Sequence, residues 1–260
     1  MAHDARRRAL LELLAREGRL DVEEAAAVMG VSAATIRRDF DRLAAQQLLV
    51  RTRGGALASG VSHELPLRSP ATAGRTPHKR RIARAVAALV APGEVVGLTG
   101  GTTTTEVARA LVLSPALAGG TPVTTLVTNA LNIATELAVR PQFKIVLAGG
   151  VARPRSYELT GPLAGSVLGQ IALDVAVLGV GAFDTEHGAT THDEEEAGIN
   201  RLLCERADRV VVAADSTKLG TRAFARICPT AQVNTLVTDT AVPSATAARF
   251  REAGVEVLAV

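Results

Sequence analysis

Cysteine and lysine are scarce in this chain of 260 residues. Cys204 and Cys228 lack the spacing of a metal-binding motif, and a cytosolic chain would keep both thiols reduced. We therefore expect them to fill space, and we expect neither a metal site nor a cofactor. Lysine occurs only at Lys79, Lys144 and Lys218, although arginine is abundant. Each lysine is a candidate for a specific role, although chance retention explains most such cases.

Long hydrophobic runs are also absent. No run has the length of a membrane span, and the first residues carry Arg6, Arg7 and Arg8 rather than the pattern of a signal peptide. We therefore expect a cytoplasmic protein with no membrane partner. Hydrophobic residues make up 47% of the chain, which is ample for a core, and this length can hold one small and one medium-sized domain.

Residues 28–55 have the pattern of a DNA-reading helix followed by a basic hairpin. Gly30 ends one short helix, and the hydroxyl of Ser32 can cap the next. Apolar residues then recur at helical spacing and predict a buried stripe: Ile36, Phe40 and Leu43. The remaining side chains of this helix can face the bases and phosphates of a major groove: Thr35, Arg37, Arg38 and Arg42.

The flanking residues complete a winged helix-turn-helix domain over residues 1–57. Apolar residues at 9–14 predict a first helix that ends near Gly18, and Asp21 can cap a second helix that runs through Val28. Short segments around Gly54 predict two strands of a wing, and Arg51 and Arg53 share one face of it. The net charge is only +3, so this clustering of arginine is local, as in a protein that presents one face to DNA. The alternative is a small helical interaction module with a solvated charged face.

A linker and an α/β domain follow. Residues 58–76 contain proline, glycine, serine and threonine, and they lack the hydrophobic periodicity of a helix or a strand. From residue 77 onward, short apolar strands are predicted at 95–98, 123–127, 143–147, 173–179, 209–214, 234–238 and 255–259. Helices are predicted at 78–90, 103–112, 129–139, 194–207 and 244–253. This alternation predicts a mainly parallel sheet covered on both faces, with ligands bound beyond the carboxyl ends of the strands.

The loops after the predicted strands contain the residues of a candidate phosphate site. Glycines let the backbone approach a ligand, and hydroxyls and helix N-terminal amides bind a dianion. The first such loop contains Gly100, Gly101, Thr102, Thr103 and Thr104. Corresponding strand ends carry Thr128, Asn129, Gly149 and Gly150. The alternative is a glycine turn capped by threonines.

Charged residues follow the later strands. Lys218 can meet a sugar hydroxyl or a phosphate, with Asp215 orienting it, and the alternative is an exposed salt bridge. Arg153 and Arg155 either add positive charge or lie in a solvated loop. The carboxylates of the acidic run at 193–196 can stabilise the start of a helix or bind a ligand, and we favour the first role. For Glu196 the two roles are more evenly balanced.

Several of these segments resemble the DeoR family of bacterial transcriptional regulators. In the N-terminal domain the resemblance rests on residues 31–39, Arg51 and residues 54–56. In the second domain it rests on five segments that occur in the family's order: residues 79–83, 101–104, 127–129, 147–150 and 215–218. It implies a sensor domain with the fold of sugar-phosphate isomerases such as ribose-5-phosphate isomerase. Two positions depart from the family's pattern: Thr99 and Gly181 stand where acidic or amide side chains are frequent.

The leading hypothesis is a transcription factor that responds to a sugar phosphate, most often a repressor of carbohydrate metabolism in this family. Its partners would be an operator in double-stranded DNA, a phosphorylated sugar and further copies of the chain, as a dimer or tetramer. The rival hypothesis is an isomerase-type enzyme with an added DNA-binding head, for which Asp184, Glu196 and Asp215 are the available bases. Because the chain offers no paired-carboxylate signature, we favour a regulator without catalytic activity.

Overall fold

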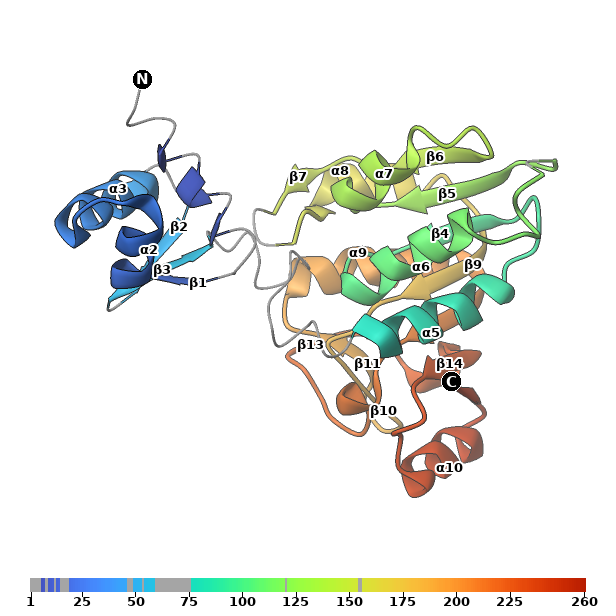
Figure 1. The fold of residues 1–260 in the computed structure, drawn as a ribbon. Coiled ribbons are helices and arrows are strands. Elements are labelled where there is room, and N and C mark those ends of the chain that lie inside the picture. Colours follow the sequence, from blue (N-terminus) through green and yellow to red (C-terminus); the bar gives the residue numbers. More distant parts are fainter. Residues whose placement is uncertain are drawn as a thin grey trace. The chain divides into compact units, whose positions relative to one another are not determined.

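Two compact units make up the chain, Met1–Gly74 and Arg75–Val260 (Figure 1). The computed structural model describes residues 6, 7, 9–11, 13, 14, 19–45, 49–52, 54–58, 76–119, 121–153 and 156–260. Most of the predicted linker, as well as Arg53 and Arg155, lies outside these residues.

The first unit contains the predicted helices. The described residues between Arg6 and Leu14 are helical. Helix α2 spans Val22–Met29, and the Asp21 carboxylate caps it by accepting the N–H of Glu23 at 2.9 Å. It ends at Gly30, which has a left-handed backbone with φ of 64°. Helix α3 spans Ala33–Ala45, and the Ser32 hydroxyl accepts the N–H of Thr35 at 3.3 Å, as the sequence predicts.

The wing has three strands, one more than we expected. Strands β1 (Arg19–Asp21), β2 (Leu49–Thr52) and β3 (Gly55–Ala58) pair antiparallel in the order β1-β3-β2. Gly55 has to be glycine, because a Cβ there would lie 2.2 Å from the carbonyl oxygen of Leu20 on β1. The predicted stripe of α3 is buried in a small core with residues from the first helix and the wing: Leu10, Leu14, Ile36, Phe40, Leu43, Leu49 and Ala56.

A seven-stranded parallel sheet forms the centre of the second unit, in the order β15-β14-β12-β9-β4-β5-β6. The strands are β4 (Val95–Leu98), β5 (Thr124–Thr128), β6 (Phe143–Leu147), β9 (Leu173–Leu178), β12 (Ala207–Ala213), β14 (Thr235–Thr238) and β15 (Glu256–Ala259). All seven are strands that the sequence predicts. The strand order reverses between β4 and β9, and in such sheets this reversal marks the ligand-binding crevice.

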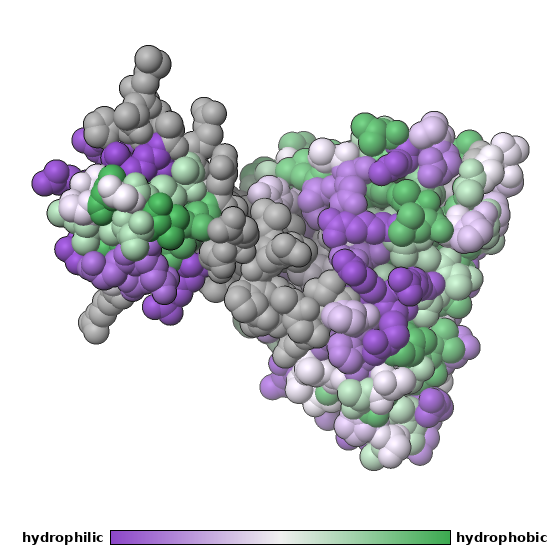
Figure 2. Space-filling model, in the orientation of Figure 1, coloured by the Kyte–Doolittle hydropathy of each residue, from purple (hydrophilic) through white to green (hydrophobic). Residues whose placement is uncertain are grey.

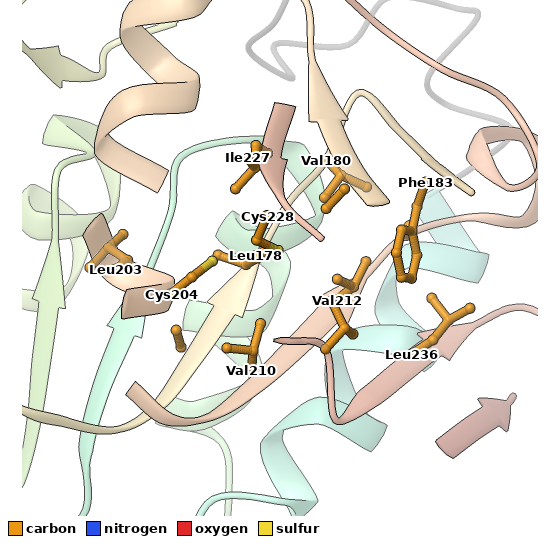
Figure 3. Close-up of a cluster of buried hydrophobic side chains, with 14 of the residues drawn as sticks. Leu178, Val180, Phe183, Leu203, Cys204, Val210, Val212, Ile227, Cys228 and Leu236 are labelled. Carbon is orange, nitrogen blue, oxygen red and sulfur yellow. The ribbon is translucent and has the colours of Figure 1, made fainter. Parts of the chain in front are cut away.

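Helices cover both faces of this sheet (Figure 1). Helices α5 (Thr76–Ala88), α6 (Thr102–Val112) and α7 (Leu131–Leu137) pack in one buried cluster, which includes Ile82, Leu111 and Ile133. Helices α8 (Pro162–Leu168), α9 (Glu194–Glu205) and α10 (Ser244–Glu252) pack in another, which includes Leu168, Leu203 and Phe250 and is drawn in part in Figure 3. The predicted fold class, a winged helix-turn-helix with a mainly parallel α/β domain, is confirmed.

Several short elements are not among those that the sequence predicts. Strands β7 (Val151–Ala152) and β8 (Leu159–Thr160) form a hairpin, and α8 follows it. Strands β10 (Ala182–Asp184), β11 (Gly188–Thr191) and β13 (Ala225–Cys228) form a small antiparallel sheet. Two 3₁₀ turns, η1 (Ser216–Lys218) and η2 (Thr230–Gln232), complete the unit. Within the described parts of the chain, no helix has the length and apolar character that crossing a membrane requires.

Candidate functional site

The loops that follow β4 and β9 meet at the reversal of strand order. The Thr99 hydroxyl accepts the N–H of Gly179 at 2.8 Å, and the N–H of Thr99 bonds to the carbonyl of Val177 at 3.2 Å. A Cβ on Gly179 would lie 3.1 Å from the carbonyl oxygen of Gly100. Thr99, one of the two departures from the family's pattern, therefore joins the two strand ends at the point where the topology predicts a ligand.

Helix α6 begins at this point. Gly101 precedes its first residue with φ of 121°, a conformation that favours glycine. The hydroxyls of Thr104 and Thr105 donate back to the Gly101 carbonyl at 3.0 and 2.7 Å, and Thr103 is buried beside them. We expected the Thr104 hydroxyl to donate to a phosphate, but it shapes the loop instead. What this end offers a ligand is the first-turn backbone N–H groups, which have no partner inside a helix.

Lys79 lies at the same helix end, although it was not among the site residues that the sequence predicted. Its side chain is buried, and its ammonium donates to the hydroxyl of Thr102 at 2.7 Å. The N-terminus of a helix carries partial positive charge, and the ammonium adds to it. The arrangement therefore favours an anion. The sequence signals for this residue were the scarcity of lysine and its place in the segment 79–83, which resembles the DeoR family.

The end of β5 contributes one structural side chain and one buried acceptor. The Thr128 hydroxyl donates to the carbonyl of Leu98 at 2.7 Å and accepts the N–H of Ala130 at 3.1 Å, so it holds β5 to β4. Asn129 is fully buried, and its amide nitrogen donates to the carbonyl of Leu159 at 3.3 Å. Its side-chain oxygen has no hydrogen-bond partner among the described residues, and a buried amide oxygen of this kind suits a donor on a ligand.

Gly149 and Gly150, which follow β6, both have positive φ, at 75° and 119°. A Cβ on Gly150 would lie 2.6 Å from the carbonyl oxygen of Thr160, so this glycine lets β8 approach the end of β6. Among the described residues other than its chain neighbours, no atom lies within 4 Å of a Cβ built on Gly149. Gly150 is therefore explained by packing, whereas Gly149 borders open space.

Glu158 is a second residue that the sequence did not identify. It is 2% exposed, and its carboxylate lies over Gly100, where a Cβ would come within 2.1 Å of its oxygen. Arg153 is not a solvated loop residue: its guanidinium contacts Asp193 at 2.8 Å, Glu196 at 3.5 Å and Glu158 at 4.0 Å. These ion pairs tie the β7–β8 hairpin to the start of α9 beside the loop after β4.

The last predicted residues follow β11 and β12. The Glu196 carboxylate accepts the hydroxyl of Thr191 at 2.9 Å. Lys218 donates to the carbonyl of Val180, in the loop after β9, so it reaches the reversal of strand order. The Asp215 carboxylate accepts both the N–H and the hydroxyl of Thr217. Asp215 therefore caps η1, the turn that carries Lys218.

Asp239, which directly follows β14, holds η1 in place. Its carboxylate accepts the N–H of Ser216 at 2.8 Å, the hydroxyl of Ser216 at 2.9 Å and the N–H of Ala241 at 3.0 Å. Burial acts to raise the pKa of Asp239, but these hydrogen bonds to the ionised form outweigh it, so the pKa lies below its usual value. An ionised Asp239 therefore holds the turn that ends at Lys218.

On the first unit, the arginines of α3 face solvent. Arg37, Arg38 and Arg42 are exposed, and Figure 2 shows hydrophilic residues around the periphery of this unit. Arg37 pairs with Glu23 at 3.3 Å, with 55% and 72% of the two side chains exposed. Exposed pairs of this kind contribute little to stability, so this one can give way to a phosphate or a base.

Arg51 has a different environment. Its guanidinium bonds to Asp41 at 2.8 Å and to the carbonyl of Gly55 at 2.6 Å, and it stacks over Phe40 at 5.7 Å from the ring centroid. Arg51 therefore braces the wing against α3, a role that the sequence did not indicate. The buried carboxylate of Asp39 plays a similar part, because Arg6 of the first helix pairs with it at 2.7 Å.

Comparisons with known proteins agree with these two units. The DeoR-like helix-turn-helix domain matches residues 6–59, and the DeoR C terminal sensor domain matches residues 75–240. A putative aga operon transcriptional repressor from Escherichia coli is 35% identical over 98% of this chain and 93% of its own length. A glycerol-3-phosphate regulon repressor from Shigella flexneri is 32% identical over 94% of this chain and 93% of its own.

Among solved structures, the ribose 5-phosphate isomerase A of Methanocaldococcus jannaschii matches 55% of this chain and 54% of its own, with 16% identity and a TM-score of 0.41. A probable sor operon regulator from Shigella flexneri matches 67% of this chain and 87% of its own, with 14% identity and a TM-score of 0.44. The two domain matches and the relatives along nearly the whole chain settle the family: the protein is a member of the DeoR family of transcriptional regulators.

Proposed function

We propose that the protein represses a carbohydrate-metabolism operon and that a phosphorylated sugar, bound at the carboxyl edge of the parallel sheet, controls its binding to the operator. The observation that carries this proposal is the position of buried Lys79 against the first turn of α6, at the reversal of strand order. The names of the relatives support it, since one represses a glycerol-3-phosphate regulon.

The phosphate would bind to the first-turn N–H groups of α6, from Thr102 to Thr104, with Gly101 keeping the approach open. Lys79 supplies positive charge from α5, and Lys218 lies nearby through its bond to Val180. Backbone N–H groups at a helix start and an ammonium are an established combination for binding phosphate. A sugar without a phosphate leaves these donors without their anion.

The sugar itself would be bound by acceptors on the neighbouring strand ends. The side-chain oxygen of Asn129 is buried and lacks a described partner, and Glu158 lies over Gly100. Glu196, which Thr191 holds, lies with Glu158 around Arg153. Hydroxyl groups are donors that suit these oxygens, and Gly149 leaves room beside them.

We propose a regulator without catalytic activity, because each of the three carboxylates that could serve an isomerase as its base has hydrogen-bond partners within the protein. Asp184 accepts the backbone N–H groups of Glu186 and His187, at the turn between β10 and β11. Glu196 is held by Thr191, and Asp215 caps η1. Each carboxylate therefore has a structural task, which argues against a free general base.

The DNA-reading element would be α3, with Thr35, Arg37, Arg38 and Arg42 directed to the major groove and Ser32 to a phosphate. Arg53 would contact the DNA backbone from the wing, and Arg51 would do so while it also braces the wing. A homo-oligomer, either a dimer or a tetramer, would place two such helices on an inverted repeat. The DNA-binding domain would comprise residues 1–57, the linker 58–76 and the sensor 77–260, in a cytoplasmic protein.

Calorimetry with matched pairs of sugars and sugar phosphates tests this function. We expect the phosphorylated member of the effector pair to bind far more tightly, and we expect no turnover of aldose or ketose phosphates. Equal binding of both members of every pair would contradict the phosphate site. Interconversion of an aldose and a ketose phosphate would favour the enzyme instead.

A further inference from the structure

The two cysteines face each other inside the second unit. Cys204 lies in the last turn of α9 and Cys228 at the end of β13, and they are 5% and 1% exposed. Both belong to one buried cluster, in which Figure 3 shows their side chains close together. Both are free thiols in this structure. The sequence suggested that they fill space, but it could not show that the fold brings them into contact.

Hydrogen bonds next to the two cysteines hold α9 against β13. Arg201, one turn before Cys204 on α9, donates from its Nε to the carbonyl of Ile227 at 3.2 Å, and it also bonds to the carbonyl of Arg226. Cys228 pairs with Ala189 of β11 in the small sheet. Bonds that do not involve the thiols therefore hold α9 and the small sheet together beside the two cysteines.

The environment makes the two thiols unequal. The neighbouring Cys204 thiol lowers the pKa of Cys228, against the effect of burial, and the backbone of Ala189 and the charge of Arg201 lower it further. The Cys228 thiol and burial raise the pKa of Cys204. The charge of Arg201 and the backbone of Ala189 therefore favour the thiolate at Cys228, and the thiolate is the nucleophilic form of cysteine.

We propose that Cys204 and Cys228 are a site of reversible oxidation, at which a hydroperoxide converts the two thiols into one intramolecular disulfide. The Cys228 thiolate attacks the peroxide oxygen, which forms a sulfenic acid and releases hydroxide, or an alkoxide from an organic peroxide. The Cys204 sulfur then attacks the Cys228 sulfur, so that an S–S bond forms and water leaves. The two thiols lose two electrons in total, and these electrons cleave the O–O bond of the peroxide.

The position of the two cysteines explains how an oxidant reaches them and what the disulfide does to the fold. Because Cys204 lies in the last turn of α9, next to exposed Glu205 and Arg206, local opening of that turn admits a small oxidant. The disulfide fixes α9 to β13. The same helix presents Glu196 to Thr191 of β11 at its other end, so the bond restrains α9 against the small sheet. A cross-link of this kind stabilises the folded protein mainly by restricting the unfolded chain.

The test uses the reduced full-length protein and hydrogen peroxide. Intact mass should fall by two hydrogen masses without a covalent dimer, and a non-reduced digest should contain the linked Cys204 and Cys228 peptides. Dithiothreitol should restore the starting mass. The thermal midpoint should rise on oxidation of the wild type but not of Cys204→Ser or Cys228→Ser, and alanine variants replace either serine variant that does not fold.

Three results would overturn the proposal. These are sulfinic acid on one cysteine without a disulfide, a disulfide between two chains, and two unmodified thiols under conditions that oxidise the unfolded chain. The experiment needs neither operator nor sugar, so its outcome is independent of the proposed effector.

Discussion

Substitution of Lys79 by methionine is the most informative perturbation of the candidate effector site. Methionine keeps the length and the apolar part of this buried side chain but removes the ammonium that bonds to Thr102 at the start of α6. If that ammonium stabilises a bound phosphate, the variant loses a charge-assisted interaction in a water-poor setting. Because the change removes one partner of the bond to Thr102, thermal unfolding has to show that the variant folds.

The expected size of the loss follows from the kind of interaction. A hydrogen bond to a charged group contributes about 1.5–3 kcal/mol. This corresponds to a roughly 10- to 150-fold increase in the Kd for the phosphorylated sugar. The unphosphorylated sugar should bind the wild type and the variant about equally, because it lacks the group that the ammonium contacts.

Lys144 provides a matched control, because it is one of the other two lysines and lies exposed near the start of β6, away from the carboxyl ends of the strands. Isothermal titration calorimetry of the wild type, Lys79→Met and Lys144→Met should show a weaker affinity only in Lys79→Met. Thermal unfolding of each variant checks the fold. If Lys79→Met binds the sugar phosphate as tightly as Lys144→Met does, Lys79 has no role in anion binding and this reasoning fails.

Three further predictions concern other parts of the molecule. Gly101→Val should abolish the ligand response and leave operator binding intact, because valine strains a backbone with φ of 121°; a variant that still releases DNA on addition of ligand would show that the loop is only a turn. In salt-titrated operator binding, Arg38→Ala should cost about 1–3 kcal/mol of affinity at unchanged stability, whereas Arg51→Ala should also lower stability by about 1 kcal/mol; normal unfolding of Arg51→Ala would refute its bracing role. The pKa of Asp239 is lowered in the folded protein, so its contribution to stability is present at neutral pH and is lost as the pH falls through that lowered value. Denaturant unfolding across acid pH should therefore show a smaller acid loss for Asp239→Asn, and an identical pH profile would contradict this assignment.

The sequence predicted the large sheet because its strands are apolar runs separated by helices and turn residues. It did not predict the small sheet, because strands such as β11, with the sequence Gly-Ala-Thr-Thr, lack both an apolar run and a clear alternation. The parallel pattern also predicted which loops would gather, since the carboxyl ends of parallel strands share one edge. That general rule placed Gly101 and Lys218 at the same edge without knowledge of their contacts.

The residues that the sequence missed owe their positions to tertiary contacts. Lys79 precedes the first strand of the sheet and reaches the site only because α5 packs beside α6. Glu158 comes from a hairpin that folds back over Gly100. The bracing role of Arg51 was missed because the alternation of side chains in a strand does not reveal that Asp41 lies opposite it. Such partners are set by packing between elements, which local periodicity does not encode.

Release of the operator by a phosphorylated sugar tests the central claim most directly. Genome-wide binding of the protein to DNA from its own source would first locate the operator, and the neighbouring genes would suggest the sugar. Fluorescence anisotropy of the labelled operator, at fixed salt, would then be measured against the matched sugar and sugar phosphate. The account predicts that only the phosphorylated form shifts operator affinity, and that Lys79→Met needs more of it. An operator complex that responds equally to both forms, or to neither form of any sugar that the neighbouring genes indicate, would contradict it.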